Sequence, residues 1–96
     1  MSIIVAIPYH ILKMEESPMK KIYQEQYRQI GLKIAYYRRL RCMTQEELAE
    51  QVDLTPAFIG HLEAPNITKA LSLDALFDIA AALDVPAYKF LIFEED

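Results

Sequence analysis

The chain of 96 residues is long enough for one small domain, because two separate cores would each be too thin to fold. Hydrophobic residues make up 53% and charged residues 25%, which excludes wholesale disorder, and no apolar run approaches the roughly 20 residues that span a bilayer. The net charge is −4. A single cysteine excludes a disulfide framework and a cysteine-based zinc finger, and two glycines are too few for a glycine-rich phosphate loop.

Residues 1–19 are expected to form an N-terminal arm. Their apolar run, Ile3–Ile7, is ended by Pro8 and has no basic residue before it, so a secretory signal is not expected. The β-branched residues of the run favour a short strand. The alternatives are an arm packed on the domain and an extension before a later start at Met14 or Met19.

Ser17-Pro18 marks a break, after which a helix is predicted over about residues 20–41. Its apolar positions recur every three or four residues and therefore share one face. They are Tyr23, Tyr27, Ile30, Ile34 and Tyr37. A helix must bury such a stripe, so we interpret the aromatic residues as core rather than as a platform for stacking bases.

Two short helices are predicted next. Thr44 and Glu47 form a capping box that begins the first, which ends near Gln51 or Val52. Thr55 caps the second, with Pro56 at its first position, and Pro65 limits its end. Their apolar residues at helical spacing are Leu48, Ala49 and Val52, then Phe58, Ile59 and Leu62.

After a loop over residues 65–71, Ser72 caps a fourth helix. Its apolar stripe comprises Leu73, Leu76, Phe77, Ala80 and Leu83. Pro86 begins a fifth helix that contains Tyr88, Phe90 and Leu91. The sequence therefore predicts an all-α, five-helix domain over residues 20–93, followed by a solvated acidic tail over residues 94–96.

The two helices of residues 44–63 share a tight turn, and the small Ala49 allows them to cross closely, as in a helix-turn-helix. This segment resembles the Cro/C1-type helix-turn-helix (XRE) family, whose domains are lambda repressor-like. The resemblance extends over residues 27–91. The residues that carry it are Ile30-Gly31, Ile34, Arg38, Thr44-Gln45-Glu46-Glu47-Leu48-Ala49, Val52, Leu54-Thr55, Ile59, His61-Leu62-Glu63, Leu73, Leu76, Ile79-Ala80, Ala82-Leu83 and Val85.

The resemblance implies a sequence-specific transcription regulator that binds double-stranded DNA, with residues 55–63 as the recognition helix in the major groove. Gln45 matches a position that contacts phosphate or braces the next helix. Arg38 and Glu63 match a structural ion pair. The DNA-contacting candidates are Thr44, Gln45, Thr55, Pro56, Ala57, Phe58, His61, Asn66, Thr68 and Lys69.

The sequence departs from the family pattern in its base-reading residues. No Arg, Lys, Asn or Gln, which form bidentate contacts with bases, lies between Thr55 and Glu63. Ala57 or Phe58 is suited to a thymine methyl group and His61 to a base edge or phosphate. Phe58 fits a core position equally well, and His61 an exposed surface position.

A second departure follows the recognition helix, where Ala64-Pro65 replaces the Arg-Gly of many members. Arg39 and Arg41 are further candidates for phosphate contact, although a solvated face is an equal alternative. Basic residues gather in the first half of the chain and acidic residues at its end, which is compatible with a nucleic-acid surface. Residues 20–64 carry seven basic and six acidic residues, a net charge of only +1, so strong non-specific DNA binding is not expected. The departures therefore predict modest affinity for each monomer.

Homodimerisation is expected, because helix-turn-helix regulators usually read two half-sites. The candidate surfaces are the arm and the apolar C-terminal end, although each alternatively covers its own core; the end comprises Tyr88, Phe90, Leu91, Ile92 and Phe93. No catalytic constellation, metal site, cofactor, membrane segment or seat for a small molecule is evident, and we expect a repressor in the cytoplasm. The alternative is a protein-interaction module of the same fold, such as an antitoxin or antirepressor.

Overall fold

The predicted all-α fold is confirmed by the computed structural model, which describes residues 20–93. Four α-helices carry the fold: α2 (Gln24–Leu40), α3 (Gln45–Gln51), α4 (Pro56–Glu63) and α5 (Leu73–Leu83). Short 3-10 helices, η1 (Lys21–Tyr23) and η2 (Ala87–Leu91), stand at either end. The fifth helix is therefore a 3-10 helix rather than an α-helix. The predicted arm and acidic tail lie outside the described residues.

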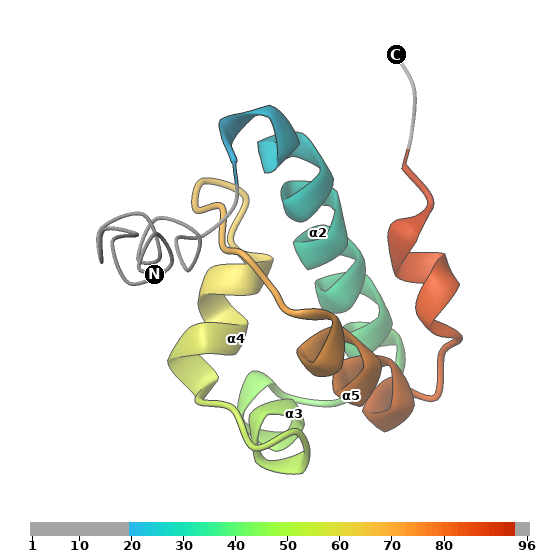
Figure 1. The fold of residues 1–96 in the computed structure, drawn as a ribbon. Helices are drawn as coiled ribbons and strands as arrows, with labels where there is room; N and C mark the ends of the chain where they lie inside the picture. Colours follow the sequence, from blue (N-terminus) through green and yellow to red (C-terminus); the bar gives the residue numbers. More distant parts are fainter. Residues whose placement is uncertain (1–19, 94–96) are drawn as a thin grey trace, which may run out of the picture.

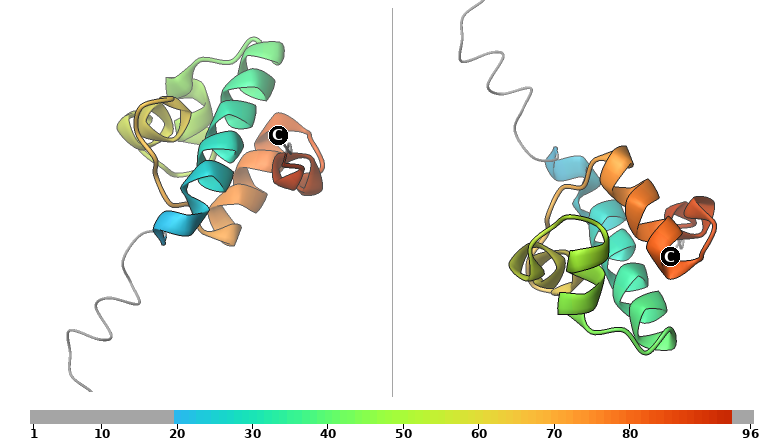
Figure 2. Two further views of the ribbon diagram at one scale, coloured as in Figure 1. Left: turned by 90° about the horizontal axis from the view of Figure 1, so that it is seen from above. Right: turned by 90° about the horizontal axis from the view of Figure 1, so that it is seen from below.

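The long helix α2 runs through the middle of the fold (Figure 1, Figure 2). Helix α4 packs against one side of α2 and η2 packs against the other, and α3 contacts both α4 and α5. The core lies between these helices, and its largest fully buried side chains are Phe90, Ile34, Leu48, Ile59, Ile79 and Leu83. This arrangement leaves the outer face of α4 free of other described elements.

Hydroxyl caps begin three of the helices, as the sequence predicts. Thr44, Thr55 and Ser72 each accept a hydrogen bond from the backbone N–H three residues later. Within two residues of its end, each of three helices is followed by a residue in the left-handed region, although none of these residues is glycine: Cys42, Asp53 and Asp84. In each case the following residue donates to the carbonyl five positions earlier, which ends the helix and turns the chain sharply.

The predicted core needs correction in two helices. In α5, Leu73 and Phe77 are 60% and 50% exposed, and Ile79 is fully buried in their place. Every residue of α5 except its two aspartates is apolar, so the sequence pattern does not determine which face is buried. Contacts with α2, α3 and η2 select that face. In the first helix, Tyr23 is exposed because it lies in η1, outside the α-helical register that buries Ile30 and Ile34.

The apolar C-terminal end divides between core and surface. Phe90 is fully buried, and its ring lies edge-on to Tyr37 with the centroids 5.4 Å apart. Phe93 is partly buried against the same core. Tyr88, Leu91 and Ile92 remain exposed. Part of the predicted dimer surface therefore covers the domain's own core.

Candidate nucleic-acid interface

The start of α3 is fixed by a reciprocal capping box. The Thr44 hydroxyl oxygen accepts from the Glu47 backbone N–H at 3.0 Å, and a Glu47 carboxylate oxygen accepts from the Thr44 backbone N–H at 2.8 Å. Thr44 is nevertheless exposed. Because a hydroxyl also carries a donor, Thr44 can donate a hydrogen bond outward while its oxygen caps the helix.

The turn between α3 and α4 is closed by backbone contacts. Asp53 adopts a φ of 55°, and the Leu54 N–H donates to the Ala49 carbonyl at 3.0 Å. The Thr55 hydroxyl then accepts from the Phe58 N–H at 3.0 Å, with Pro56 in the first turn of α4. These local interactions determine where α4 begins and in which direction it leaves the turn.

Three side chains from three helices tie α4 to the rest of the domain. Arg38 donates to both carboxylate oxygens of Glu63, from Nε at 2.6 Å and from Nη2 at 2.9 Å. Gln45 donates from Nε2 to Glu63 Oε1 at 2.9 Å, and Arg38 Nη1 donates to the Met43 carbonyl at 2.7 Å. The arginine and the glutamate are only 8% and 6% exposed. Gln45 is thus a brace for α4.

The hydrogen bonds that Arg38 donates to the Glu63 carboxylate raise the pKa of the Arg38 guanidinium above its already high ordinary value. Arg38 therefore stays charged at every pH at which a protein of this kind folds. A buried positive charge needs its carboxylate partner, so the position of Glu63 at the C-terminal end of α4 is strongly specified.

The outer face of α4 is small and largely apolar. Pro56, Ala57 and His61 are exposed, whereas Phe58 is half-buried and packs against the core. A Cβ at Gly60 would lie 3.6 Å from Gln45 Oε1, so this glycine is next to the Gln45 side chain. This face offers methyl and methylene groups and one imidazole, without any amide or guanidinium.

The loop after α4 brings one cation to this helix. The Lys69 ammonium lies 5.6 Å from the centroid of the Phe58 ring, a cation–π contact. Asn66 is exposed in the same loop, and Thr68 is half-buried. The structure therefore places Lys69 beside α4, a juxtaposition that sequence spacing alone does not show.

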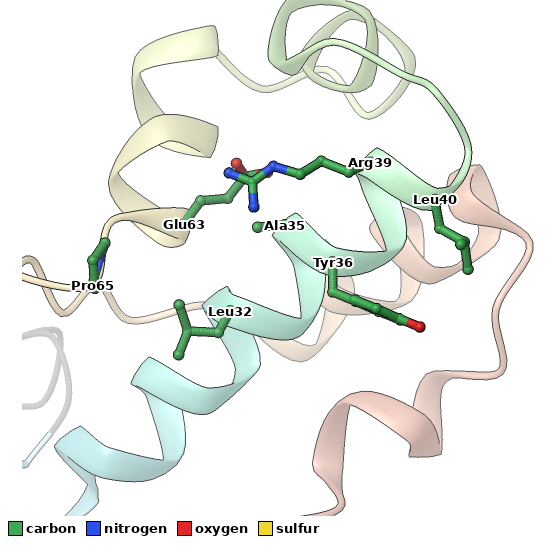
Figure 3. A pocket seen from close by; sticks show the side chains of 7 residues that line it. All are labelled: Leu32, Ala35, Tyr36, Arg39, Leu40, Glu63 and Pro65. Carbon is green, nitrogen blue, oxygen red and sulfur yellow. The ribbon is translucent and has the colours of Figure 1, made fainter.

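The two arginines at the end of α2 have different surroundings. Arg41 donates from Nε to the Leu83 carbonyl at 2.7 Å and from Nη2 to the Asp84 carbonyl at 3.0 Å, so it caps the C-terminus of α5. Arg39 extends toward Glu63 along a pocket of about 580 Å³, whose apolar lining includes Leu32, Tyr36 and Leu40 (Figure 3). Sequence reasoning missed the structural role of Arg41, because Leu83 and Asp84 lie far along the chain.

The candidate residues therefore form two neighbouring groups. Thr44 and Gln45 stand at the start of α3, and the remaining candidates line α4 and the loop that follows it. Within residues 20–93, no cluster of His, Cys, Asp and Glu could hold a metal ion, and no helix is long and apolar enough to cross a membrane. The candidate residues therefore provide hydrogen-bond donors, one ammonium group and apolar surface for contact with a partner.

Comparisons with known proteins agree with this geometry. A family model described as helix-turn-helix, HTH_3, matches residues 34–90. The N-terminal DNA-binding domain of SinR from Bacillus subtilis has 26% sequence identity and a TM-score of 0.62, over 72% of this chain and 99% of that one. PlcR from Bacillus thuringiensis, in complex with the peptide PapR7 and DNA, has 28% identity and a TM-score of 0.59, over 71% of this chain and 24% of that one. No curated protein sequence gives a significant match.

Proposed function

The chain belongs to the helix-turn-helix family of DNA-binding transcription regulators, and from that premise we propose that it is a repressor that binds its operator as a homodimer in the cytoplasm. In this proposal α4 lies in the major groove, where its exposed residues face the base edges. The observation that carries the proposal is the bracing of α4 by Arg38 and Gln45 through Glu63, while no other element of residues 20–93 covers the outward face.

The phosphate contacts in this proposal come from both sides of α4. Thr44 donates from the start of α3, and Asn66, Thr68 and Lys69 lie in the loop after α4. Only one of these groups is a cation, and each neutralised phosphate contributes to salt-dependent affinity. A monomer is therefore expected to bind weakly, and two linked half-sites would supply the missing affinity.

Exposed apolar side chains support the homodimer. Tyr88, Leu91 and Ile92 are all exposed at the η2 side, which is turned away from α4. Large apolar side chains exposed close together in the sequence are candidates for an interaction site. A repressor needs only to occupy a promoter-overlapping operator, so the DNA interface and a dimer surface suffice for this activity.

The test is selection of duplexes from a random DNA library by the full chain at about 150 mM salt, where non-specific binding is weak. We expect an enriched inverted repeat, and a promoter that carries this repeat should be repressed in a reporter assay. The control is Glu63→Gln, in which the brace of α4 is weakened. No enrichment by the folded protein would contradict DNA reading, and enrichment of single half-sites would contradict the dimer.

A second candidate function is a protein-interaction module, such as an antitoxin or antirepressor. The observation that favours it is the pocket between α2 and the end of α4, lined by Leu32, Tyr36 and Leu40 (Figure 3). The α4 face also lacks the polar groups that usually read bases. Failure of the DNA selection, together with a partner whose binding is lost on Tyr36→Lys, would favour this alternative.

A further inference from the structure

Lys33 carries an ammonium group for which the described structure provides no acceptor. It projects from α2, and its Nζ is buried without a hydrogen-bond partner among the described residues. An ammonium has three N–H donors and strongly favours hydration. Burying it without an acceptor is unfavourable, so the site favours an occupant that accepts hydrogen bonds from this ammonium.

The contact that Lys33 does make is with an aromatic ring. Its Nζ lies 5.5 Å from the centroid of the Phe93 ring. A cation–π interaction offsets part of the cost of removing the ammonium from water, but it satisfies no N–H donor. The ring thus helps to hold the charge in place while leaving its hydrogen-bonding capacity unused.

This ammonium belongs to a pocket between α2 and η2. The pocket has a volume of about 330 Å³ and is lined by Lys33, Tyr37, Tyr88, Lys89 and Ile92. Among the described residues, two lysines and no acidic residue line it, so its electrostatic preference is for an anion. Its other lining residues are two tyrosines and an isoleucine, which suit an anion that carries an apolar part.

We propose that the pocket between α2 and η2 binds a carboxylate group, with Lys33 Nζ as its principal hydrogen-bond donor. Lys89 is exposed, so Lys33 supplies the one buried ammonium, which matches the single charge of a carboxylate. Phosphate sites, in contrast, usually combine arginines or several backbone N–H groups. The pocket lies on the side of α2 away from α4, so its occupant would not compete with DNA.

The carboxylate can come from two sources. One is a free small molecule, and the other is the acidic sequence Glu94-Glu95-Asp96, which directly follows Phe93. Both would offer the same group to Lys33. A variant that replaces the three acidic residues by their amides, Glu94→Gln, Glu95→Gln and Asp96→Asn together, separates the two sources.

The experiment is a titration of the full chain, labelled with ¹³C-lysine, with sodium benzoate as the probe and its neutral isostere benzamide as the control. NMR follows the side-chain signals of Lys33, which are assigned by their loss in Lys33→Met. The exposed Lys20 and Lys21 serve as internal controls for general salt effects. The titration is run at two protein concentrations, because Tyr88 and Ile92 also belong to the proposed dimer surface.

We expect a saturable shift of the Lys33 signals with benzoate, several-fold larger than at Lys20 or Lys21, and no comparable shift with benzamide. A response in the unmodified chain supports a free carboxylate ligand. A response only in the triple-amide variant supports occupation by the acidic sequence. The proposal is overturned if, at the lower concentration, neither chain responds, or if benzamide acts as strongly as benzoate.

Discussion

The backbone of Gly31 in α2 passes so close to the carbonyl of Leu62 in α4 that a Cβ at residue 31 would overlap the Leu62 carbonyl oxygen. The neighbour is rigid main chain, which cannot give way as a flexible side chain would. The crossing of these two helices, and with it the position of α4, therefore depends on the absence of a side chain at residue 31.

We expect Gly31→Ala to lower the free energy of unfolding by about 2 kcal/mol or more, because forced overlap in a packed core typically costs 1–3 kcal/mol. Urea denaturation followed by circular dichroism measures the change. Gly60→Ala is the matched control, since its Cβ would meet Gln45 Oε1 at an ordinary 3.6 Å. That variant should be neutral, or stabilised by up to about 1 kcal/mol through helix propensity. Equal stability of the two variants would contradict the close crossing.

The buried pair of Arg38 and Glu63 gives a second prediction. Glu63→Gln leaves a charged guanidinium without a carboxylate, and breaking a buried pair costs about 3–5 kcal/mol. We expect the lower end of that range, because an amide oxygen still accepts a hydrogen bond. The measurement is the midpoint of thermal or urea unfolding.

The matched control for this pair is the double variant Arg38→Met with Glu63→Leu. It removes both charges, so it should be closer to the unmodified chain in stability than Glu63→Gln is. Gln45→Ala removes one hydrogen bond to the same carboxylate and should cost about 1 kcal/mol. If Glu63→Gln unfolds at the original midpoint, the pair does not hold α4.

A third prediction concerns acid titration of the exposed pair in the first turns of α2. Hydrogen bonds from Arg28, and secondarily from Gln29, lower the pKa of Glu25 from 4.5 to about 2. The folded pKa is depressed, so the pair favours the folded state above about pH 4.5, and this contribution is lost as the pH falls toward 2. The Glu25 carboxyl resonance in ¹³C NMR should show the low midpoint.

The variant Arg28→Met removes the main donor, so the midpoint of Glu25 should rise toward its ordinary value. High salt should raise it too, because an exposed pair is screened. A midpoint that does not respond to Arg28→Met would show that the ion pair is not the cause of the shift.

Local chemistry made the helix starts predictable from the sequence. The hydroxyl of Thr44 with Glu47 three residues later, and Thr55 followed by Pro56, each specify a helix start without reference to the rest of the chain. The buried positions of α3 and of the interior of α2 were predictable as well, because they follow from helical periodicity. The family resemblance supplied the two-helix motif and its outward face.

Features that depend on packing between distant segments were not predictable. The apolar residues around α5 allowed two buried faces, and tertiary contacts chose Ile79 over Leu73 and Phe77. The cap that Arg41 places on α5 and the contact of Lys69 with Phe58 likewise join segments that sequence spacing does not connect. The Lys33 pocket depends on η2, which lies far from α2 in the sequence.

The last prediction concerns how α4 would read DNA. The amide nitrogen of Gln45 is engaged by Glu63, and the exposed Pro56 and Ala57 present only apolar groups. Apart from the imidazole of His61, apolar contact with the C5-methyl group of thymine is therefore the expected means of sequence reading. Replacing the contacted thymine of a selected half-site by uracil removes the C5-methyl group. This change should weaken binding about fourfold, since one buried methyl group contributes about 0.8 kcal/mol.

The Ala57→Gly variant isolates this contact, because it removes the methyl group on the protein side. In that variant the same thymine-to-uracil change should have no further effect on the affinity for DNA. Fluorescence anisotropy measures this affinity. Ala81→Gly, at an exposed position of α5, is the matched control for the cost of glycine in a helix and should keep the full fourfold sensitivity. An equal loss in all three proteins would show that Ala57 does not touch the methyl group, while DNA binding by the domain would still stand.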